Sequence, residues 1–260
     1  MPAHLPTGEN GHMSKVYRAL ERAEGQRAKA APKAPPVLDD PREGNANGRG
    51  PSDVGEYERL GTAILHARAA APFKTVMVAS PDHGEGTSTV AEGLALTLAE
   101  RGRLSVLLVD ANLRSPAADE TIHAEPVAGL TEVLAGETSI EAVIEDTETP
   151  NLRFVAAGGA VHGSARLLDT ARLPALLAEL ATKNDVVIFD APPVLPYADA
   201  LTLASKVDRV ILVTQAERTQ RGHLERAKDE LEQCGATILG VVLNRKASHA
   251  PPWLRRCLNL

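Results

Sequence analysis

From about residue 54 onward, short apolar runs alternate with stretches in which apolar residues recur at helical spacing. The runs are continuous rather than alternating, as expected of strands in a parallel sheet whose two faces are both covered. Between two of them, residues 90–98 carry one apolar stripe, and Gly102 ends that helix. Strict alternation of strand and helix predicts an α/β fold, with a mainly parallel, twisted sheet and helices on both faces. The predicted strands are residues 74–79, 105–109, 152–155, 185–189, 209–213 and 238–243.

The chain before this domain follows a different pattern. Residues 30–53 carry five prolines and three glycines. Because such a stretch cannot bury enough apolar surface to offset its ordering entropy, we predict a disordered linker. Residues 1–29 are interpreted as a tail with one short amphipathic helix at 14–24, which either docks on a partner or has no role. Met13 is a second candidate for the first residue.

The predicted domain spans residues 54–247 and is followed by a basic C-terminal tail, 248–260. The stretch 245–260 holds four basic residues and no acid. This segment either touches anionic lipid near a membrane or is a solvated tail.

Composition narrows the class of protein. The chain has 28 Lys and Arg against 34 Asp and Glu, a net charge of −6, and 3% aromatic residues, which argues against a nucleic-acid binder. Its two cysteines cannot form a disulfide framework, and no apolar run is long enough to span a membrane. We therefore expect a cytoplasmic protein. The eight histidines lack the spacing of zinc ligands.

The segment with the clearest chemistry is a glycine-bearing turn between a buried strand and a helix that begins at Ser88. Gly84 and Gly86 allow the backbone to approach a ligand closely, and successive N–H groups at the helix N-terminus form an anion cradle. A phosphate-binding P-loop ends in Gly-Lys-[Ser/Thr], but here Thr87 stands where the lysine is expected. His83 is no substitute, since a mostly neutral imidazole supplies neither reach nor fixed charge. The candidate nucleotide-binding residues of this loop are Gly84, Glu85, Gly86, Thr87, Ser88 and Thr89.

Two aspartates lie at the ends of other predicted strands. Asp110 directly follows the predicted strand at 105–109, and Asp190 directly follows the predicted strand at 185–189. Ligands of open α/β sheets bind at the carboxyl ends of strands, and carboxylates there commonly hold Mg²⁺ in nucleotide hydrolases. The alternative for each aspartate is a strand-end cap.

Together these motifs resemble the bacterial tyrosine kinases of capsule and exopolysaccharide synthesis. The resemblance covers about residues 57–245 and implies a P-loop NTPase fold of the MinD/ParA-like class. Its markers are Tyr57-Glu-Arg-Leu-Gly-Thr62, Gly84-Glu-Gly-Thr-Ser-Thr89, Leu107-Leu-Val-Asp-Ala-Asn-Leu-Arg-Ser-Pro116, Gly129-Leu-Thr-Glu-Val-Leu-Ala-Gly136, Asp185-Val-Val-Ile-Phe-Asp-Ala-Pro-Pro193 with Asp199, and Gly240-Val-Val-Leu-Asn244.

The resemblance implies roles for individual residues. Ser88, Asp110 and Asp190 would hold Mg²⁺, and the two aspartates would keep residual catalytic roles. Asn244 would read the adenine edge of ATP or ADP, for which its amide offers a donor and an acceptor. The alternative for Asn244 is a loop cap.

The departures from the family pattern concern the chemistry. Asn112 replaces a second aspartate and cannot act as a general base. No tyrosine follows Tyr197, so the usual tyrosine-rich tail is absent. Loss of the lysine at Thr87 should cost on the order of 3–4 kcal/mol in the transition state, a rate factor of about 10²–10³. Weak nucleotide binding with little or no phosphotransfer is the expected result.

The family's oligomerisation motif, Glu-x-x-Arg-x-x-Arg, is not matched. Aligned through Tyr57, it falls on Gly55, Glu58 and Gly61, and a frame shifted by one recovers only its first two residues. A homo-oligomer is left open on this evidence. Lys206 and Arg218, near predicted strand ends, are interpreted as solvated cations.

Three hypotheses follow. The favoured one is a degenerate member of the kinase family that regulates polysaccharide export with a membrane co-polymerase of the Wzz type, at the inner face of the membrane. The second is an active kinase that requires this partner as an activator. The third is a MinD/ParA-like nucleotide switch, although no lysine lies between Ser80 and Gly86 to supply the deviant P-loop of that class.

Overall fold

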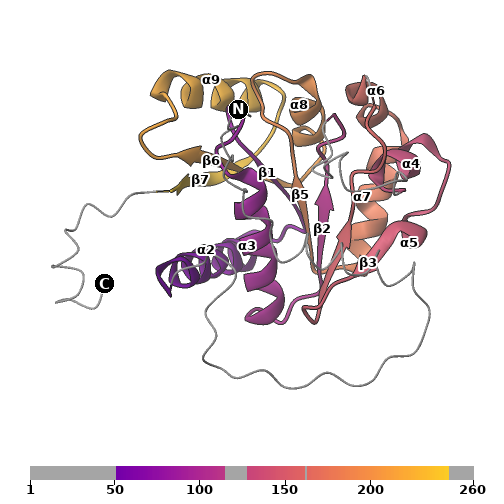
Figure 1. Ribbon diagram of the computed structural model, residues 1–260, viewed down its shortest axis with the longest axis horizontal. Coiled ribbons are helices and arrows are strands. Elements are labelled where there is room, and N and C mark those ends of the chain that lie inside the picture. The colour runs from indigo at the N-terminus through magenta and orange to yellow at the C-terminus, as the bar shows by residue number, and fades with distance from the viewer. Residues whose placement is uncertain (1–50, 115–127, 162, 246–260) are drawn as a thin grey trace, which may run out of the picture.

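The computed structural model describes residues 51–114, 128–161 and 163–245 (Figure 1). Within these ranges the centre of the molecule is one seven-stranded sheet in the order β3-β4-β2-β5-β1-β6-β7. Neighbouring strands pair in parallel except β3 and β4, which are antiparallel. The predicted α/β fold with a mainly parallel sheet is therefore confirmed. The strands are β1 (Thr75–Ala79), β2 (Val106–Asp110), β3 (Ile144–Asp146), β4 (Leu152–Val155), β5 (Val186–Asp190), β6 (Arg209–Gln215) and β7 (Ile238–Asn244).

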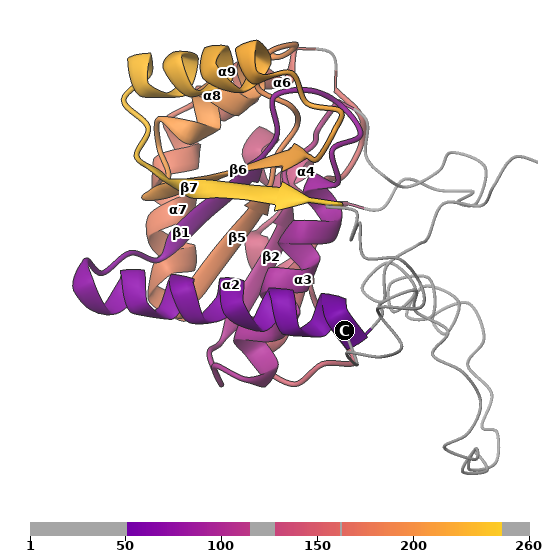
Figure 2. The same cartoon turned by 90° about the vertical axis from the view of Figure 1, so that its left-hand side faces the viewer.

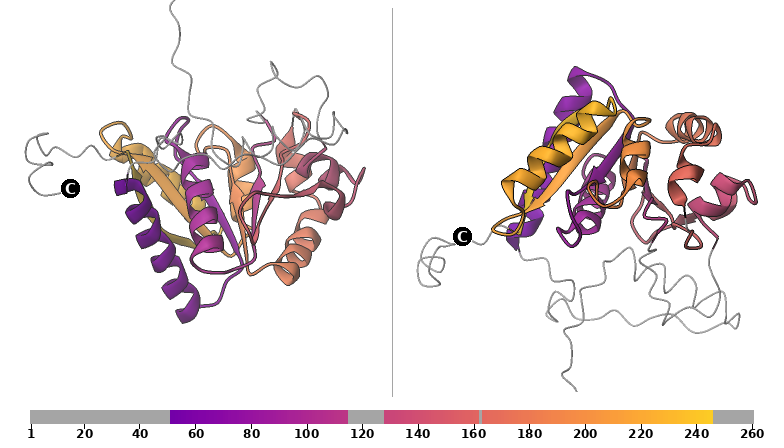
Figure 3. Two further views of the ribbon diagram at one scale, coloured as in Figure 1. Left: turned by 60° about the horizontal axis from the view of Figure 1, so that its bottom comes forward. Right: turned by 90° about the horizontal axis from the view of Figure 1, so that it is seen from above.

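Helices cover both faces of the sheet, as the continuous apolar strands require (Figures 2 and 3). Helices α2 and α3 pack on one face, where Ile64 and Leu94 join a core with Ile188 of β5. The other helices pack on the opposite face around Phe189. Within the described ranges, no helix has both the length and the apolar character of a membrane-spanning segment. The helices are α2 (Pro51–Ala70), α3 (Thr87–Glu100), α4 (Leu130–Ala135), α5 (Ile140–Val143), α6 (Ser164–Leu168), α7 (Arg172–Lys183), α8 (Ala198–Ala204) and α9 (Arg221–Gln233).

Two features differ from the sequence-based expectations. Strand β3 was not predicted, because its three residues, Ile-Glu-Asp, are too few and too polar to form a visible pattern at a sheet edge. Helix α2 begins at Pro51, so residues 51–53 belong to a helix rather than to the predicted linker. Proline is compatible with a first helical turn because its missing N–H has no helical partner there. The predicted tail helix, the linker up to residue 50 and the basic tail at 248–260 lie outside the described residues.

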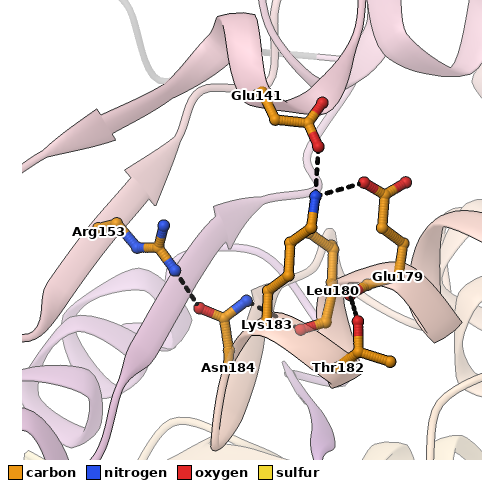
Figure 4. A network of polar contacts seen from close by, with 7 residues as sticks. All are labelled: Glu141, Arg153, Glu179, Leu180, Thr182, Lys183 and Asn184. Carbon is orange, nitrogen blue, oxygen red and sulfur yellow. Dashed lines mark hydrogen bonds and ion pairs between the residues drawn. The ribbon is translucent and has the colours of Figure 1, made fainter.

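A polar network joins the end of α7 to α5 and β4 on the face opposite α3 (Figure 4). Lys183 pairs with Glu141 and, at 2.8 Å, with Glu179. These contacts lower the pKa of Glu141 to about 2, with the hydrogen bond from Lys183 as the largest cause. Arg153 Nη2 donates to Oδ1 of the Asn184 side chain at 2.7 Å, and Asn184 Nδ2 donates to the Leu180 carbonyl at 2.9 Å. The network fixes where α7 ends and does not reach the site described below.

The strand order sets the position of that site. Strand β5 lies between β2 and β1, so three central strands end at the same edge of the sheet. Asp110, the last residue of β2, is the Cα partner of Asp190, the last residue of β5, and Val78 of β1 is the partner of Asp190 on the other side. The loop from β1 to α3 therefore begins beside both aspartates. Crevices at the carboxyl ends of such strands are the usual ligand sites of open α/β sheets.

Candidate nucleotide site

The loop between β1 and α3 has the backbone of an anion-binding turn. Gly84 and Gly86 adopt left-handed conformations, with φ of 79° and 89°. Gly86 is the N-cap of α3, which begins at Thr87, one residue before the predicted start. The first N–H groups of α3 thus follow the glycine turn directly, and this is the geometry that binds phosphate.

Thr87 is bonded within the loop rather than pointed at a ligand. Its Oγ1 donates to Ser80 Oγ at 2.9 Å, and Ser80 Oγ donates in turn to the Asp82 carbonyl at 2.7 Å. Thr87 is half-buried and Ser80 is buried. The position that carries a phosphate-binding lysine in a P-loop is therefore occupied by a short hydroxyl that stabilises the loop itself.

Ser88, Asp110 and Asp190 come together at the edge of the sheet. Ser88 makes a hydrogen bond to Asp190, while Asp110 Oδ1 accepts from the Asn112 backbone N–H at 2.9 Å. Burial raises the pKa of Asp190 well above its usual range, and the negative charges of Asp110 and Glu92 raise it further against the opposing bond from Ser88. Negative charge gathered at one point would be relieved by a cation, and hydroxyl and carboxylate oxygens suit Mg²⁺. These residues therefore fit the predicted metal role, which stays a prediction.

Protein carboxylates alone do not complete a metal site. Among the described residues, no group of three or more His, Cys, Asp and Glu side chains is placed to hold a metal ion. Mg²⁺ usually keeps several waters and takes one or two carboxylates together with substrate phosphates. A cation at Asp110 and Asp190 would thus depend on a bound nucleotide for further ligands.

Glu92 is a member of this acidic group that the sequence analysis missed. It lies one helical turn after Ser88 on α3, and its residue is 6% exposed. Glu92 lies beside the apolar stripe of Val90, Ala91 and Leu94 rather than within it, at a position where a polar residue is ordinary, so no sequence pattern marked its burial. A buried charged residue is rare without a partner or a function.

Asn244 contacts the loop as a loop cap would, which is the alternative to an adenine contact. Its Nδ2 donates to the Glu85 carbonyl at 2.9 Å, and its Oδ1 accepts from the Arg245 backbone N–H at 2.8 Å. A Cβ on Gly86 would lie 2.2 Å from Asn244 Nδ2, so only glycine leaves room for this contact. The amide keeps one N–H and one lone pair for a base edge, and the predicted adenine role is still untested.

Glu85 faces inward beneath the loop. It is 2% exposed, and its Oε1 accepts from Thr219 Oγ1 at 2.5 Å. Burial raises the pKa of Glu85, and hydrogen bonds from Thr219 and the Asp82 backbone partly offset the rise. Glu85 therefore ties the loop to the turn after β6, and its side chain is buried beneath the loop. For Glu85, therefore, only the backbone N–H remains a candidate ligand of phosphate.

Two arginines contact the loop at the Gly84 carbonyl. Arg218, in the turn after β6, and Arg245, directly after β7, each place Nη1 within hydrogen-bond distance of the Gly84 carbonyl, at 3.2 and 3.3 Å. Each Nη1 also lies 3.3 Å from Gln215 Oε1. Arg218 is exposed, as the sequence analysis expected, but it contacts the loop instead of standing free in solvent.

A second set of contacts supports the other side of the loop. His83 Nε2 lies 3.2 Å from the Tyr197 hydroxyl, and the Arg114 guanidinium lies 4.8 Å from the centre of the Tyr197 ring. Arg114 pairs with Asp199, which is 1% exposed and also accepts from Ser164 Oγ at 2.8 Å. The loop, the end of β2 and the start of α8 are thus held together by one connected network.

The fold and the loop are those of an α/β protein of the P-loop class, in which a glycine turn after β1 opens onto a helix N-terminus and two strand-end aspartates. The family model described as an AAA domain matches residues 73–233. The tyrosine-protein kinase YwqD of Bacillus subtilis (strain 168) is 34% identical over 191 residues, which are 74% of this chain and 80% of that protein. This chain belongs to the family of bacterial tyrosine kinases.

Solved structures agree with this assignment. The kinase domain of the Escherichia coli tyrosine kinase ETK superposes with a TM-score of 0.69 at 27% identity, over 77% of this chain and 79% of that one. The septum site-determining protein MinD of Pyrococcus horikoshii OT3, complexed with Mg-ADP, gives a TM-score of 0.55 at 27% identity, over 71% and 76% of the two chains. The P-loop fold of the MinD-like class is therefore confirmed.

Proposed function

We propose that this chain is a cytoplasmic, tyrosine-kinase-like P-loop protein that regulates capsular or exopolysaccharide synthesis and export together with a membrane co-polymerase of the Wzz type. It binds nucleotide but has weak or no phosphotransfer activity of its own. Family membership supports the first part. The single observation that carries the second is the hydrogen bond from Thr87 to Ser80, because it fixes a neutral hydroxyl where a P-loop has its lysine.

The cofactor of this proposal is ATP or ADP with Mg²⁺. The N–H groups from Gly84 to Thr89 would receive the phosphates, and Ser88, Asp110 and Asp190 would hold the metal. Mg²⁺ supplies charge neutralisation at the phosphates when bound. The chain's own contribution is positioning. Asn112 stands in place of a second aspartate and cannot take the proton from the hydroxyl group that would receive the phosphoryl group.

The test combines binding with activity. Calorimetry with ADP and Mg²⁺ should show binding, while incubation with labelled ATP should leave the protein and a tyrosine-containing peptide unlabelled. Thr87→Lys is the matched variant, and it should bind ATP more tightly and gain any activity that the missing charge withholds. Autophosphorylation by the parent chain at the rate of the Thr87→Lys variant would overturn the proposed weak activity. Failure of both chains to bind nucleotide would overturn the nucleotide site.

An active kinase that needs its partner is the second candidate. The observation that favours it is the positive charge of Arg218 and Arg245 beside the loop, which lessens the deficit left by Thr87. The same assay with the cytoplasmic segment of the co-polymerase decides between the two. Transfer only in the mixture supports the activated kinase, and no transfer supports the regulatory protein. Light scattering with and without ATP tests a MinD-like switch, which requires a nucleotide-dependent dimer.

A further inference from the structure

Arg218 and Arg245 form a cationic pair that two separate elements bring to one point. Both Nη1 atoms lie against the same two oxygens, Gly84 O and Gln215 Oε1, at 3.2–3.3 Å. Adjacent like charges repel, so the pair is held by two neutral acceptors against its own electrostatics. An arrangement of this kind gains stability when an anion arrives between or beside the two guanidinium groups.

The charges of the pair are not neutralised within the described part of the chain. There, neither arginine has a carboxylate oxygen within 4 Å, whereas Arg101, Arg114, Arg221 and Arg226 each have one. Arg218 lowers the pKa of Glu85, but this is the last and smallest of the causes acting on that buried carboxyl. Both positive charges are therefore available to a ligand.

Both arginines also keep donors for such a ligand. A guanidinium carries five N–H groups, and the side-chain bonds to described residues all leave from Nη1. The Nε and Nη2 groups remain, in the planar fork that matches two phosphate oxygens. The backbone makes room for this, since Gly84 has no side chain and a Cβ there would lie 3.1 Å from Arg218 Nη1.

We propose that Arg218 and Arg245 bind the phosphate groups of the nucleotide and replace the positive charge that Thr87 does not supply. Gln215 is a positioning residue, because its Oε1 accepts from both arginines and holds them side by side. The inference rests on the proposed function, which places a nucleotide in this loop. It differs from the P-loop pattern in its source of charge, which comes from the turn after β6 and the end of β7 rather than from the loop.

The first experiment measures ADP affinity by calorimetry in the presence of Mg²⁺ for the full chain. Arg218→Ala and Arg245→Ala should each weaken binding about tenfold, as expected for a charged hydrogen bond, and the double variant more than either. Arg226→Ala is the matched control, because Arg226 is an exposed arginine on α9 already paired with Glu230, and it should bind like the parent. Affinity unchanged in the double variant would overturn the inference.

Two further variants separate charge from structure. Gln215→Glu keeps the shape but places a carboxylate between the arginines, so it should weaken ADP binding about as much as one arginine loss. Adding Thr87→Lys to the double arginine variant should restore much of the lost affinity, because the lysine supplies the same charge from inside the loop. A lysine that rescues nothing would show that the arginines act on folding rather than on phosphate.

The probes distinguish this inference from the nucleotide site itself. Pyrophosphate with Mg²⁺ should follow the same order of affinities as ADP, whereas any binding of adenosine, which has no phosphate, should not change with the arginines. If the parent chain binds neither ADP nor pyrophosphate, the nucleotide site and the inference both fail. If ADP binds but the arginine variants match the parent, only the inference fails.

Discussion

The hydroxyl of Thr87 donates a hydrogen bond to the hydroxyl of Ser80, 2.9 Å away, across the base of the phosphate loop. Ser80 passes the bond on to the Asp82 carbonyl. The residue that departs from the P-loop pattern is thus part of the loop's internal structure. The loop is closed on itself without the long cationic side chain that other P-loops extend into the ligand.

The first prediction concerns this bond. Thr87→Val keeps the side-chain shape but leaves Ser80 Oγ without its donor, so we expect a loss of about 1 kcal/mol in unfolding free energy. In a domain of this size that corresponds to roughly 2–4 °C in melting temperature. Thr89→Val, at an exposed position two residues on, should change stability by less than about 0.5 kcal/mol. Equal melting temperatures for the two variants would contradict the structural role of Thr87.

The second prediction concerns Gly86. Alanine there meets Asn244 Nδ2 at 2.2 Å and must adopt φ near 89°, so the amide has to leave the Glu85 carbonyl. We expect Gly86→Ala to lower the unfolding free energy in urea by about 1–3 kcal/mol and to weaken ADP binding. Gly222→Ala is the control, because that glycine lies in α9 with open space around it, and the change should be neutral or stabilising by up to about 1 kcal/mol. Equal losses in the two variants would argue against a strained contact at Gly86.

The third prediction follows from the raised pKa of Asp190. A carboxyl group whose folded pKa lies above its ordinary value of 3.8 favours folding in its neutral form. Its contribution is therefore complete below the ordinary value and is lost as the pH rises through the raised one. Asp190→Asn should melt higher than the parent at pH 8, by roughly 2–4 °C, and the difference should shrink toward pH 4.

Melting curves across this pH range test the sign of the effect. Asp229→Asn, which removes an exposed carboxylate from α9, serves as the control and should show no comparable dependence on pH. An Asp190→Asn protein that is less stable than the parent at pH 8 would mean that the charged form of Asp190 is favoured in the fold.

The fourth prediction concerns Asp199, which is buried and accepts from both Arg114 and Ser164. Asp199→Ala leaves a buried hydroxyl and a partly buried guanidinium without their acceptor, so we expect a loss of about 2–4 kcal/mol in unfolding free energy. Asp169→Ala also breaks an ion pair, to Lys206, but Asp169 is 75% exposed and should cost at most about 0.5 kcal/mol. Urea unfolding at neutral pH measures both, and similar values would remove the case for the Asp199 network.

Those parts of the site that depend on local sequence patterns could be predicted from the sequence. The strand before Ser80 and the stripe after Val90 locate the loop, because buried strands and helices leave continuous and periodic apolar runs. Asp110 and Asp190 were placed at strand ends for the same reason, and the register makes them neighbours. Glu92 was missed because it lies beside the apolar stripe, and only the tertiary structure shows that it is buried.

Other features depend on contacts between residues that are far apart in the sequence. The amide of Asn244, for which the sequence left open an adenine contact or a loop cap, bonds the Glu85 carbonyl, 159 residues away in sequence. Strand β3 forms only because the longer β4 offers it an edge to pair with. Neither relationship leaves a pattern in its own segment, because a hydrogen bond between distant residues imposes no periodicity on either.

By itself, the sequence determined the alternation of strands and helices, the glycine turn and the threonine at the position of the lysine, because each depends on neighbouring residues. Only the tertiary structure decided where positive charge returns to the loop. Arg218 and Arg245 lie 134 and 161 residues from Gly84 in the chain and reach it because β6 lies beside β1 in the sheet and β7 lies beside β6. The charge around a site depends on which strand ends are neighbours in the sheet, and the order of strands in the sheet is decided only when the chain folds.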